Sequence, residues 1–315
     1  MKKMINTEHI EGRVYEHDLA IKTVQNQESD NFGKEFIAGS LNIATDDAGL
    51  NVITVHFTYV TPTTKAGKKN STFSALKKII EEGKAIVTDG DNATKVKIDT
   101  ALALNDFYGQ DDSLVSVKKN EGGFVTIVSE LSAENERNTF TTDMLITNIV
   151  RVDADEEKNI TESYVAVRGA IFNFRNDILP VEFIVRNPEG MKYFESLTLT
   201  PSEPIFTKVW GRINSTTQII EKTEDSAFGE AAVKTFERKT KEWVITGAQP
   251  VPYDYGDENC LTAEDIIKAT QNREVYLAEV KKKAEEYKAS KASNQTSAFA
   301  TAAPSQPVAA GGFNF

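Results

Sequence analysis

Basic and aromatic side chains alternate along three short segments of this chain that have the pattern of β-strands. The segments are Ile10–Val14, Val167–Ile171 and Val209–Ile213, and each reads apolar-x-Gly-x-apolar. Successive side chains of a strand point to opposite faces, so the apolar residues and the glycine share one face. The opposite face carries Arg13, Tyr15 and His17 in the first segment, Arg168, Phe172 and Phe174 in the second, and Phe206, Lys208, Trp210 and Arg212 in the third. Cations bind phosphates and flat rings stack on unpaired bases, so this face has the chemistry to bind a single-stranded nucleic acid.

The glycine in the middle of each segment indicates a bend. A glycine inside a strand usually marks a sharp bend, as at the corner of a small barrel. A fourth segment, Ile37–Leu41, repeats the apolar and glycine pattern without the cationic face. We interpret all four as barrel strands. A β-sandwich whose aromatic residues only pack against neighbours has the same pattern, and this alternative stays open on the sequence.

A basic loop follows the alternating strand predicted over Asn51–Val60. The loop spans residues 61–70, contains Gly67, and carries Lys65, Lys68 and Lys69. We predict that these three lysines contact phosphates, and the alternative is a solvated hairpin. The whole chain is acidic, with a formal net charge of −11. Net charge is a global property and a binding groove is local, so the acidity does not exclude a nucleic acid partner.

Composition places the chain among soluble globular proteins. Of its 315 residues, 40% are hydrophobic and 26% are charged. No apolar run is long enough to cross a bilayer, and no apolar stretch follows the N-terminal lysines as a secretory signal would require. A single cysteine, Cys260, fits a reducing compartment. We therefore expect a protein of bacterial or host-cell cytoplasm that does not bind membranes.

The predicted fold class is mostly β with a few helices. Residues 1–152 and 158–258 each read as strands with one helix between them, the order expected of an OB-fold-like barrel. A helix over 261–288, with Thr262 and Asp265 at its start, and a disordered tail over 289–315 complete the chain. The expected strands are Ile10–Val24, Phe36–Thr45, Asn51–Val60, Lys95–Ala103, Phe124–Ser129, Met144–Val152, Tyr164–Phe174, Val181–Val185, Phe206–Ile213 and Glu242–Thr246, and the expected short helices are Thr72–Glu82 and Gly190–Leu197.

No motif of the sequence indicates catalysis. His9, His17 and His56 lie far apart from one another and from Cys260, so no metal site is predicted. Phosphate-binding, nucleophile and dinucleotide signatures are missing as well. We expect a protein that is not an enzyme and takes no cofactor.

With its barrel strands, aromatic and cationic face and Phe-terminated tail, the chain resembles single-stranded DNA-binding proteins of the phage type. The resemblance covers residues 5 to about 250 in architecture and 289–315 in tail design. It implies OB-fold domains and a C-terminal tip, here Phe313 and Phe315, that recruits replication or recombination enzymes. Tips of this class are typically acidic, whereas no acidic residue follows Glu286 here. An inert tail is therefore the alternative for this segment.

Two hypotheses of different classes follow. The first is a sequence-independent single-stranded DNA-binding protein that acts in replication or recombination of a phage or mobile element. The second is a structural or assembly β-protein, such as a virion component, whose aromatic faces are interfaces and which has no nucleic acid role.

Overall fold

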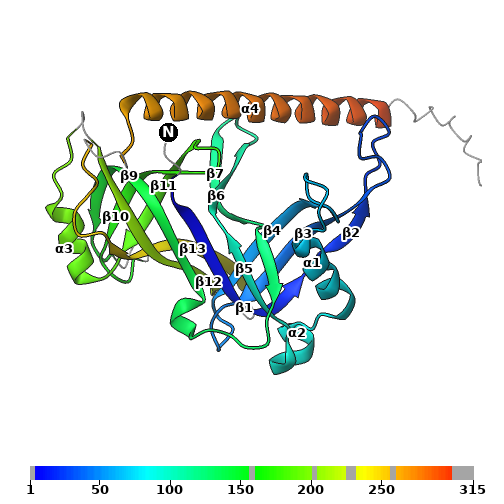
Figure 1. Cartoon of the computed structure of the whole chain (residues 1–315), viewed down its shortest axis with the longest axis horizontal. Coiled ribbons are helices and arrows are strands. Elements are labelled where there is room, and N and C mark those ends of the chain that lie inside the picture. Colours follow the sequence, from blue (N-terminus) through cyan, green and yellow to red (C-terminus); the bar gives the residue numbers. More distant parts are fainter. Residues whose placement is uncertain (1–3, 156–159, 201–203, 225–231, 256–259, 300–315) are drawn as a thin grey trace, which may run out of the picture. The chain divides into compact units, whose positions relative to one another are not determined.

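Strands dominate the computed structural model of the chain, which confirms the mostly β prediction (Figure 1). The structure describes residues 4–155, 160–200, 204–224, 232–255 and 260–299, and within 216–224, 232–234, 236–239 and 291–299 it describes the backbone alone. The chain divides into two compact units, residues 1–105 with 117–273 and residues 106–116 with 274–315.

Nine strands belong to the described part of the first half. They are β1 (Asn6–His17), β2 (Ala20–Thr23), β3 (Glu35–Ala44), β4 (Val52–Val60), β5 (Lys95–Thr100), β6 (Leu102–Tyr108), β7 (Leu114–Glu121), β8 (Phe124–Ile127) and β9 (Asn138–Val152). The segments Ile10–Val24 and Lys95–Ala103, each predicted as one strand, fall into two strands, β1 with β2 and β5 with β6. Strand β7 was not predicted.

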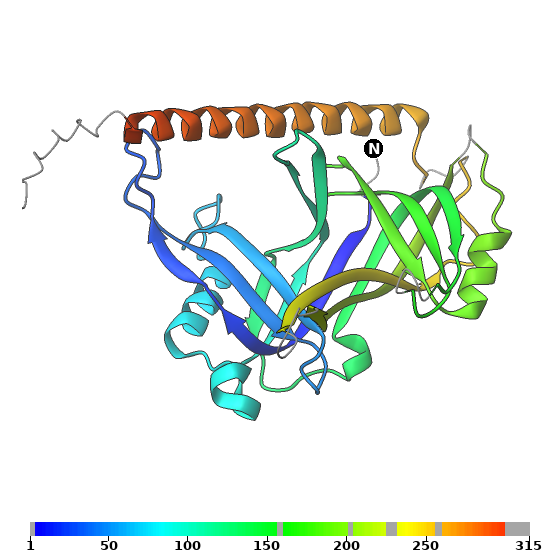
Figure 2. The same cartoon turned by 180° about the vertical axis from the view of Figure 1, so that it is seen from behind.

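The second half contributes β10 (Tyr164–Phe172), β11 (Ile178–Val185), β12 (Ile205–Glu224) and β13 (Ala232–Ala248). Strand β12 pairs with β13 from Val209 to Glu224 and forms a long hairpin with it, seen from behind in Figure 2. The sheet order is β10-β11-β13-β12-β9-β1-β3-β4-β7-β6. Because β9 pairs with β1 as well as with β10 and β12, the strands of both halves share one sheet. The division into two barrels stays a prediction.

The main core runs through both halves. Phe140, Phe183 and Trp243 are all at most 2% exposed. Their rings follow one another, with centroids 5.2 Å apart for Phe140 and Phe183 and 5.6 Å apart for Phe183 and Trp243. Ile10 of β1 belongs to the same cluster. Aromatic packing therefore joins β9, β11 and β13 beneath the sheet.

Each mid-strand glycine lies where another backbone comes close. The register shifts at Gly39, Gly169 and Gly211, as a β-bulge requires. A methyl group on Gly169 would collide with the carbonyl oxygen of Leu145, and one on Gly211 with that of Val244. At Gly12 the collision would be with the carbonyl oxygen of Ala44. The glycines were predicted to mark bends, and the structure shows register shifts at three of them and a close backbone approach at Gly12, Gly169 and Gly211.

The short helices begin and end close to the predicted residues. Helix α1 (Ser71–Glu82) starts at Asn70, whose side chain accepts a hydrogen bond from the Thr72 N–H, and ends where the Gly83 N–H donates to Ile79. Helix α3 (Pro188–Ser196) starts at Asn187 in the same way. A four-residue helix, α2 (Ile86–Asp89), and the 3-10 turns η1 (Gly90–Asn92) and η2 (Glu134–Glu136) were not predicted.

The C-terminal helix α4 (Ala263–Phe299) begins as predicted and ends later. Thr262 and Asp265 form a reciprocal cap, in which the Asp265 N–H donates to the Thr262 hydroxyl and the Thr262 N–H to the Asp265 carboxylate. The helix was predicted to end at residue 288, which is wrong. Residues 289–299 are rich in alanine and contain no glycine or proline, so nothing in them stops a helix. Phe313 and Phe315 lie outside the described residues. No described helix is long and apolar enough to cross a membrane.

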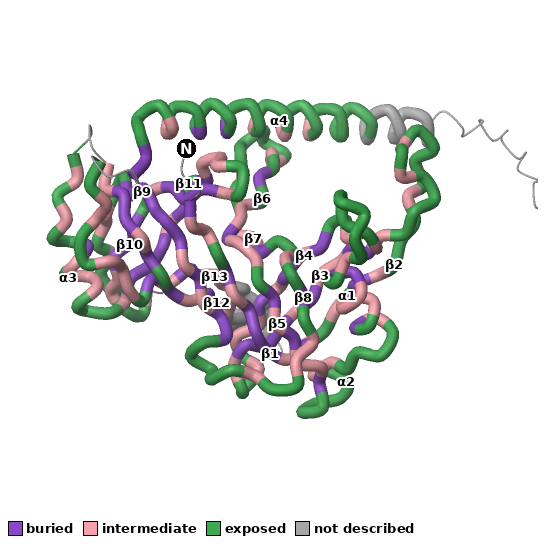
Figure 3. The backbone as a smooth tube through the Cα atoms, viewed as in Figure 1, coloured by how far each residue is buried: buried purple, intermediate pink, exposed green. Residues whose placement is uncertain are grey.

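A second, smaller core covers part of the other face of the sheet. Leu145, Phe172 and Phe206 pack there against Leu261 and Ala269. Leu261 precedes α4 and Ala269 lies in its second turn. Figure 3 shows buried residues at this end of α4 and mainly exposed ones beyond it. Within the first unit, the outer face of the sheet is thus covered where Leu145, Phe172 and Phe206 lie.

Candidate nucleic-acid interface

The open part of the outer face is a row of side chains from five neighbouring strands. Paired residues of adjacent strands point to the same side of a sheet. The register places one residue of each strand in this row: Arg212 of β12, Thr139 of β9, His9 of β1, Asp99 of β5 and Phe124 of β8. With strands spaced about 4.8 Å apart, the row is on the order of 19 Å long.

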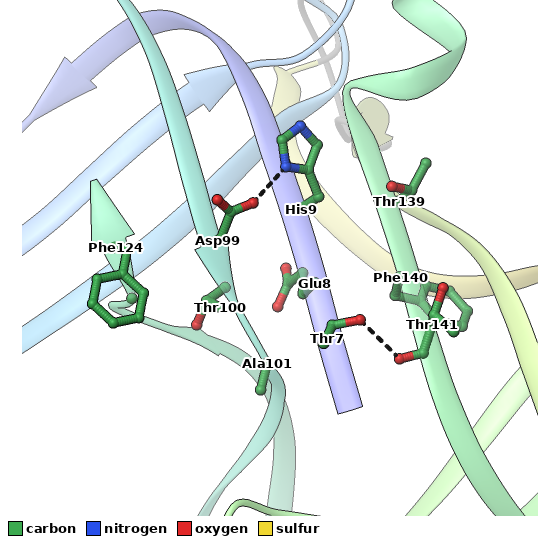
Figure 4. A pocket seen from close by; sticks show the side chains of 11 residues that line it. Thr7, Glu8, His9, Asp99, Thr100, Ala101, Phe124, Thr139, Phe140 and Thr141 are labelled. Atoms are coloured by element: carbon green, nitrogen blue, oxygen red, sulfur yellow. Dashed lines mark hydrogen bonds and ion pairs between the residues drawn. The ribbon is translucent and has the colours of Figure 1, made fainter. Parts of the chain in front are cut away.

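A second row beside the first contains Trp210, Thr141 and Thr7. We call the two rows together, with Lys208, the Trp210–Phe124 face. Its middle is a hollow of about 590 Å³ that Thr7, Thr139, Thr141 and Phe124 help to line (Figure 4). Thr7, Thr139 and Thr141, with His9 and Asp99, lie between Trp210 and Phe124, so the two aromatic residues stand at opposite ends of the face.

Trp210 and Phe124 are exposed, 41% and 75% respectively. Trp210 lies opposite Gly247 of β13, and a methyl group at Gly247 would collide with the indole ring. The indole therefore packs against β13 at a position without a side chain, and Trp210 keeps its 41% exposure. An exposed tryptophan on a flat sheet face is uncommon without a ligand or partner.

An ionic network includes two residues of the face, His9 and Asp99. His9 is 2.7 Å from an Asp99 carboxylate oxygen and 3.3 Å from a Glu11 oxygen. Burial favours the neutral form of Glu11, but hydrogen bonds from Ser132 and His9 outweigh it and lower the pKa of this carboxyl. These contacts fix the imidazole in the row between Thr139 and Asp99.

The basic residues of the predicted site have different surroundings. Arg212 donates to the Asn135 carbonyl oxygen, 2.5 Å away, and Lys208 lies opposite Asp143. Arg13 lies further along β1, where its guanidinium donates to the Asp91 carboxylate at 2.9 Å and to the Asp47 carbonyl at 2.7 Å. Arg13 is therefore held by Asp91 and the Asp47 backbone, whereas Lys208 and Arg212 flank Trp210 on β12.

The structure contradicts the predicted exposure of Phe172 and Phe206. Both point to the outer side as predicted, but they are 0% and 1% exposed because Leu261 and the start of α4 cover them. A ring enclosed in this way has no free surface on which a base can stack. The covering residues lie more than 50 positions further along the chain, so strand alternation could not reveal them.

Three more predicted residues lie away from the Trp210–Phe124 face. Tyr15 is the extra residue of a β-bulge between Val14 and Glu16. The bulge interrupts the strand alternation, so Tyr15 does not share a face with Arg13. Arg168 is exposed and donates to Glu182, 2.6 Å away. Phe174 follows the end of β10 and is 83% exposed, with the Arg175 guanidinium 5.2 Å from its ring centroid.

The basic loop borders a hollow of its own. Lys65, Lys68 and Lys69 are exposed, as predicted. Lys65 helps to line a hollow of about 710 Å³ together with Lys34 and Tyr59. The Tyr59 ring is 44% exposed and packs on Phe36 with centroids 4.7 Å apart. The loop therefore stands beside an accessible aromatic ring.

Thr7, Thr139, Thr141 and Phe124 were not predicted as site residues. Alternation shows that each faces outward, but an outward threonine is common in any strand. Only the register of five strands shows that these residues share one face with Trp210. In the described part of the chain, no group of three or more histidine, cysteine or acidic residues is arranged to hold a metal ion.

The chain belongs to the YorF family, whose sequence model matches residues 5–283. No curated protein matches the sequence. Among solved structures, the chain is similar to a deletion mutant of the single-stranded DNA-binding protein from Thermus aquaticus. That match has 10% sequence identity, covers 82% of this chain and 100% of the other, and has a TM-score of 0.45. A TM-score below 0.5 does not establish a shared fold.

Proposed function

We propose that this chain binds single-stranded DNA without strong sequence preference, and that unpaired bases stack along the Trp210–Phe124 face. The observation that carries the proposal is the exposed indole of Trp210, which shares an open sheet face with a second exposed ring. Between the rings, the threonine hydroxyls can donate to or accept from base edges. Lys208 and Arg212 beside Trp210 supply charge for phosphates.

The proposal includes a role in replication or recombination of a phage or mobile element, without catalysis. Binding protects a single strand by occupying it, and such a role needs no reacting group. Recruitment of partner enzymes through Phe313 and Phe315 is part of the same proposal.

Binding of labelled oligo-dT tests the proposal, with fluorescence polarisation as the measurement. We expect Trp210→Ala and Phe124→Ala each to weaken binding by about 5- to 150-fold, because one stacked base contributes roughly 1–3 kcal/mol. Phe174→Ala is the matched control, since this ring is also exposed but lies off the face. The control should bind as the wild type does, and all three variants should keep the wild-type melting temperature.

Tryptophan fluorescence gives a second measurement. Trp243 is 1% exposed, so added DNA should quench the emission of Trp210 and leave that of Trp243. An affinity for oligo-dT no higher than for duplex DNA at low salt would refute the proposal. A change of self-association in Trp210→Ala without any DNA binding would instead assign the face to protein assembly.

A further inference from the structure

Three lysines and a histidine line a separate hollow of about 440 Å³. Lys118 and Lys119 come from β7, His56 from β4 and Lys241 from β13. We call these four residues the lysine groove. Its lining contains a single acid, Asp18, and the Ser40 N–H and hydroxyl both donate to that carboxylate. The groove therefore has an excess of positive charge.

Lys118 is the residue that points most clearly to a ligand. Its ammonium lies 5.1 Å from the centroid of the buried Trp243 ring, and its burial lowers the pKa of the amine. Among the described residues it forms no hydrogen bond or ion pair. The two acids that favour its charged form, Glu182 and Glu242, are already bound by Arg168 and Arg186. A half-buried ammonium that has an aromatic ring but no described ionic partner gains a favourable charge pair when an anion binds beside it.

His56 lies among the lysines of the groove. Burial first, and then the charges of Lys241 and Lys119, lower the pKa of its imidazole, while Asp18 and Glu121 act in the opposite direction. Glu121 is also paired with Lys119, 3.1 Å away. A bound anion would offset the positive charge of the lysines and would therefore raise the pKa of His56.

We infer that the lysine groove binds phosphate groups, and that these are phosphodiesters of the single strand. The assignment to a phosphodiester rests on the proposed function. Three lysines from two strands around one hollow suit an oxyanion, because ammonium groups bind phosphate as point charges that need no planar geometry. The groove is lined by none of the residues of the Trp210–Phe124 face, so the two sites can be tested independently.

The test uses the full chain with ¹³C-labelled histidine and measures the pKa of His56 by NMR. The probes are oligo-dT, inorganic phosphate and dTTP. We expect oligo-dT to raise the pKa of His56 and to do so at lower concentration than the other two. A rise with phosphate or dTTP but not with oligo-dT would overturn the assignment to a phosphodiester. No change with any probe would overturn the phosphate site itself.

Variants separate this inference from the proposed function. Lys118→Met keeps the stem over Trp243 and removes the charge, and Lys77→Met on the exposed side of α1 is the control. We expect Lys118→Met to weaken oligo-dT binding by 3- to 30-fold at low salt and to lower the salt slope by about 0.7, with Lys77→Met unchanged. If Lys118→Met bound oligo-dT as the wild type does while Trp210→Ala lost affinity, phosphate binding by the lysine groove would be refuted. The proposed function would not be affected.

Discussion

On the outer side of β12, the same strand presents one aromatic residue to solvent and hides another. Phe206 is 1% exposed and Trp210 is 41% exposed, although both have outward-facing side chains. Leu261 and Ala269 cover Phe206. Trp210 instead packs over Gly247, which has no side chain. What a side chain can bind is therefore decided by which residues cover it as much as by its type.

Glu8 is a second residue whose surroundings set its chemistry. It is 2% exposed, and neither carboxylate oxygen has a hydrogen-bond partner among the described residues. Burial raises the pKa of this carboxyl well above its ordinary value, and Lys241 opposes the shift only in part. Between the two pKa values the unfolded state loses the proton and the folded state keeps it. Stability should therefore fall as the pH rises through this window.

We expect Glu8→Gln to remove this loss. The variant should be more stable than the wild type at pH 8, by about 1.4 kcal/mol for each pKa unit of the shift, and the difference should shrink towards pH 4. Urea unfolding at pH 4, 6 and 8 measures it. Glu81→Gln, on the exposed side of α1, is the control and should show no such trend. A wild-type stability that rises with pH relative to Glu8→Gln would contradict the argument.

At the scale of elements, the bulged glycines determine how closely strands approach. A methyl group on Gly211 would meet the Val244 carbonyl oxygen and lie 2.8 Å from a ring carbon of Phe140. Neither is the end of a flexible chain, so the strands would have to separate.

We expect Gly211→Ala to lower the free energy of unfolding by about 1–3 kcal/mol or more, measured by urea unfolding. Gly67→Ala is the control, because its added methyl group meets nothing and only the positive φ of 74° is strained. That control should cost about 1 kcal/mol. If the two variants were destabilised equally, the close approach at Gly211 would not matter.

The basic loop is a second element whose role can be measured. Lys65, Lys68 and Lys69 are exposed, and Lys65 borders the hollow with Tyr59. Changing all three to alanine should lower the slope of log affinity against log salt by about 0.7 for each phosphate that the loop no longer neutralises. Replacement of Lys281, Lys282 and Lys283 on α4 is the charge-matched control. An unchanged slope in the loop variant would place the loop outside the DNA path.

At the scale of the whole molecule, α4 has two parts with different roles. Leu261 and Ala269 are buried against the sheet, but no described residue from 274 to 290 is buried. The segment 289–315 is rich in small and polar residues, and we expect its removal to change the free energy of unfolding by less than about 0.5 kcal/mol.

A truncation that also removes residues 261–288 serves as the contrast. It would expose Phe172 and Phe206, each worth roughly 1.5–3 kcal/mol of burial, and should lower the melting temperature and promote aggregation. Thermal unfolding of both truncated chains measures the difference. A large loss of stability in the shorter truncation would mean that the tail packs against the body of the protein.

Local features of this protein could be predicted from sequence because their causes are local. Asn70 and Gly83 bound α1 through hydrogen bonds to residues within four positions, and Thr262 and Asp265 cap α4 in the same way. Strand alternation correctly placed Trp210, Lys208 and Arg212 on the side opposite the core. Alternation failed only where a bulge, as at Tyr15, changed the register.

The composition of the site depended on contacts between residues far apart in the chain. Thr7 meets Thr141, and Asp99 meets Phe124, through strand pairings that no local pattern encodes. The covering of Phe172 and Phe206 likewise depends on a helix that follows the last strand. By itself, the sequence determined which side chains face outward, because side-chain direction follows from backbone geometry. Only the tertiary structure decided which of them remain open to a ligand, because covering a face is a property of the assembled sheet and helix.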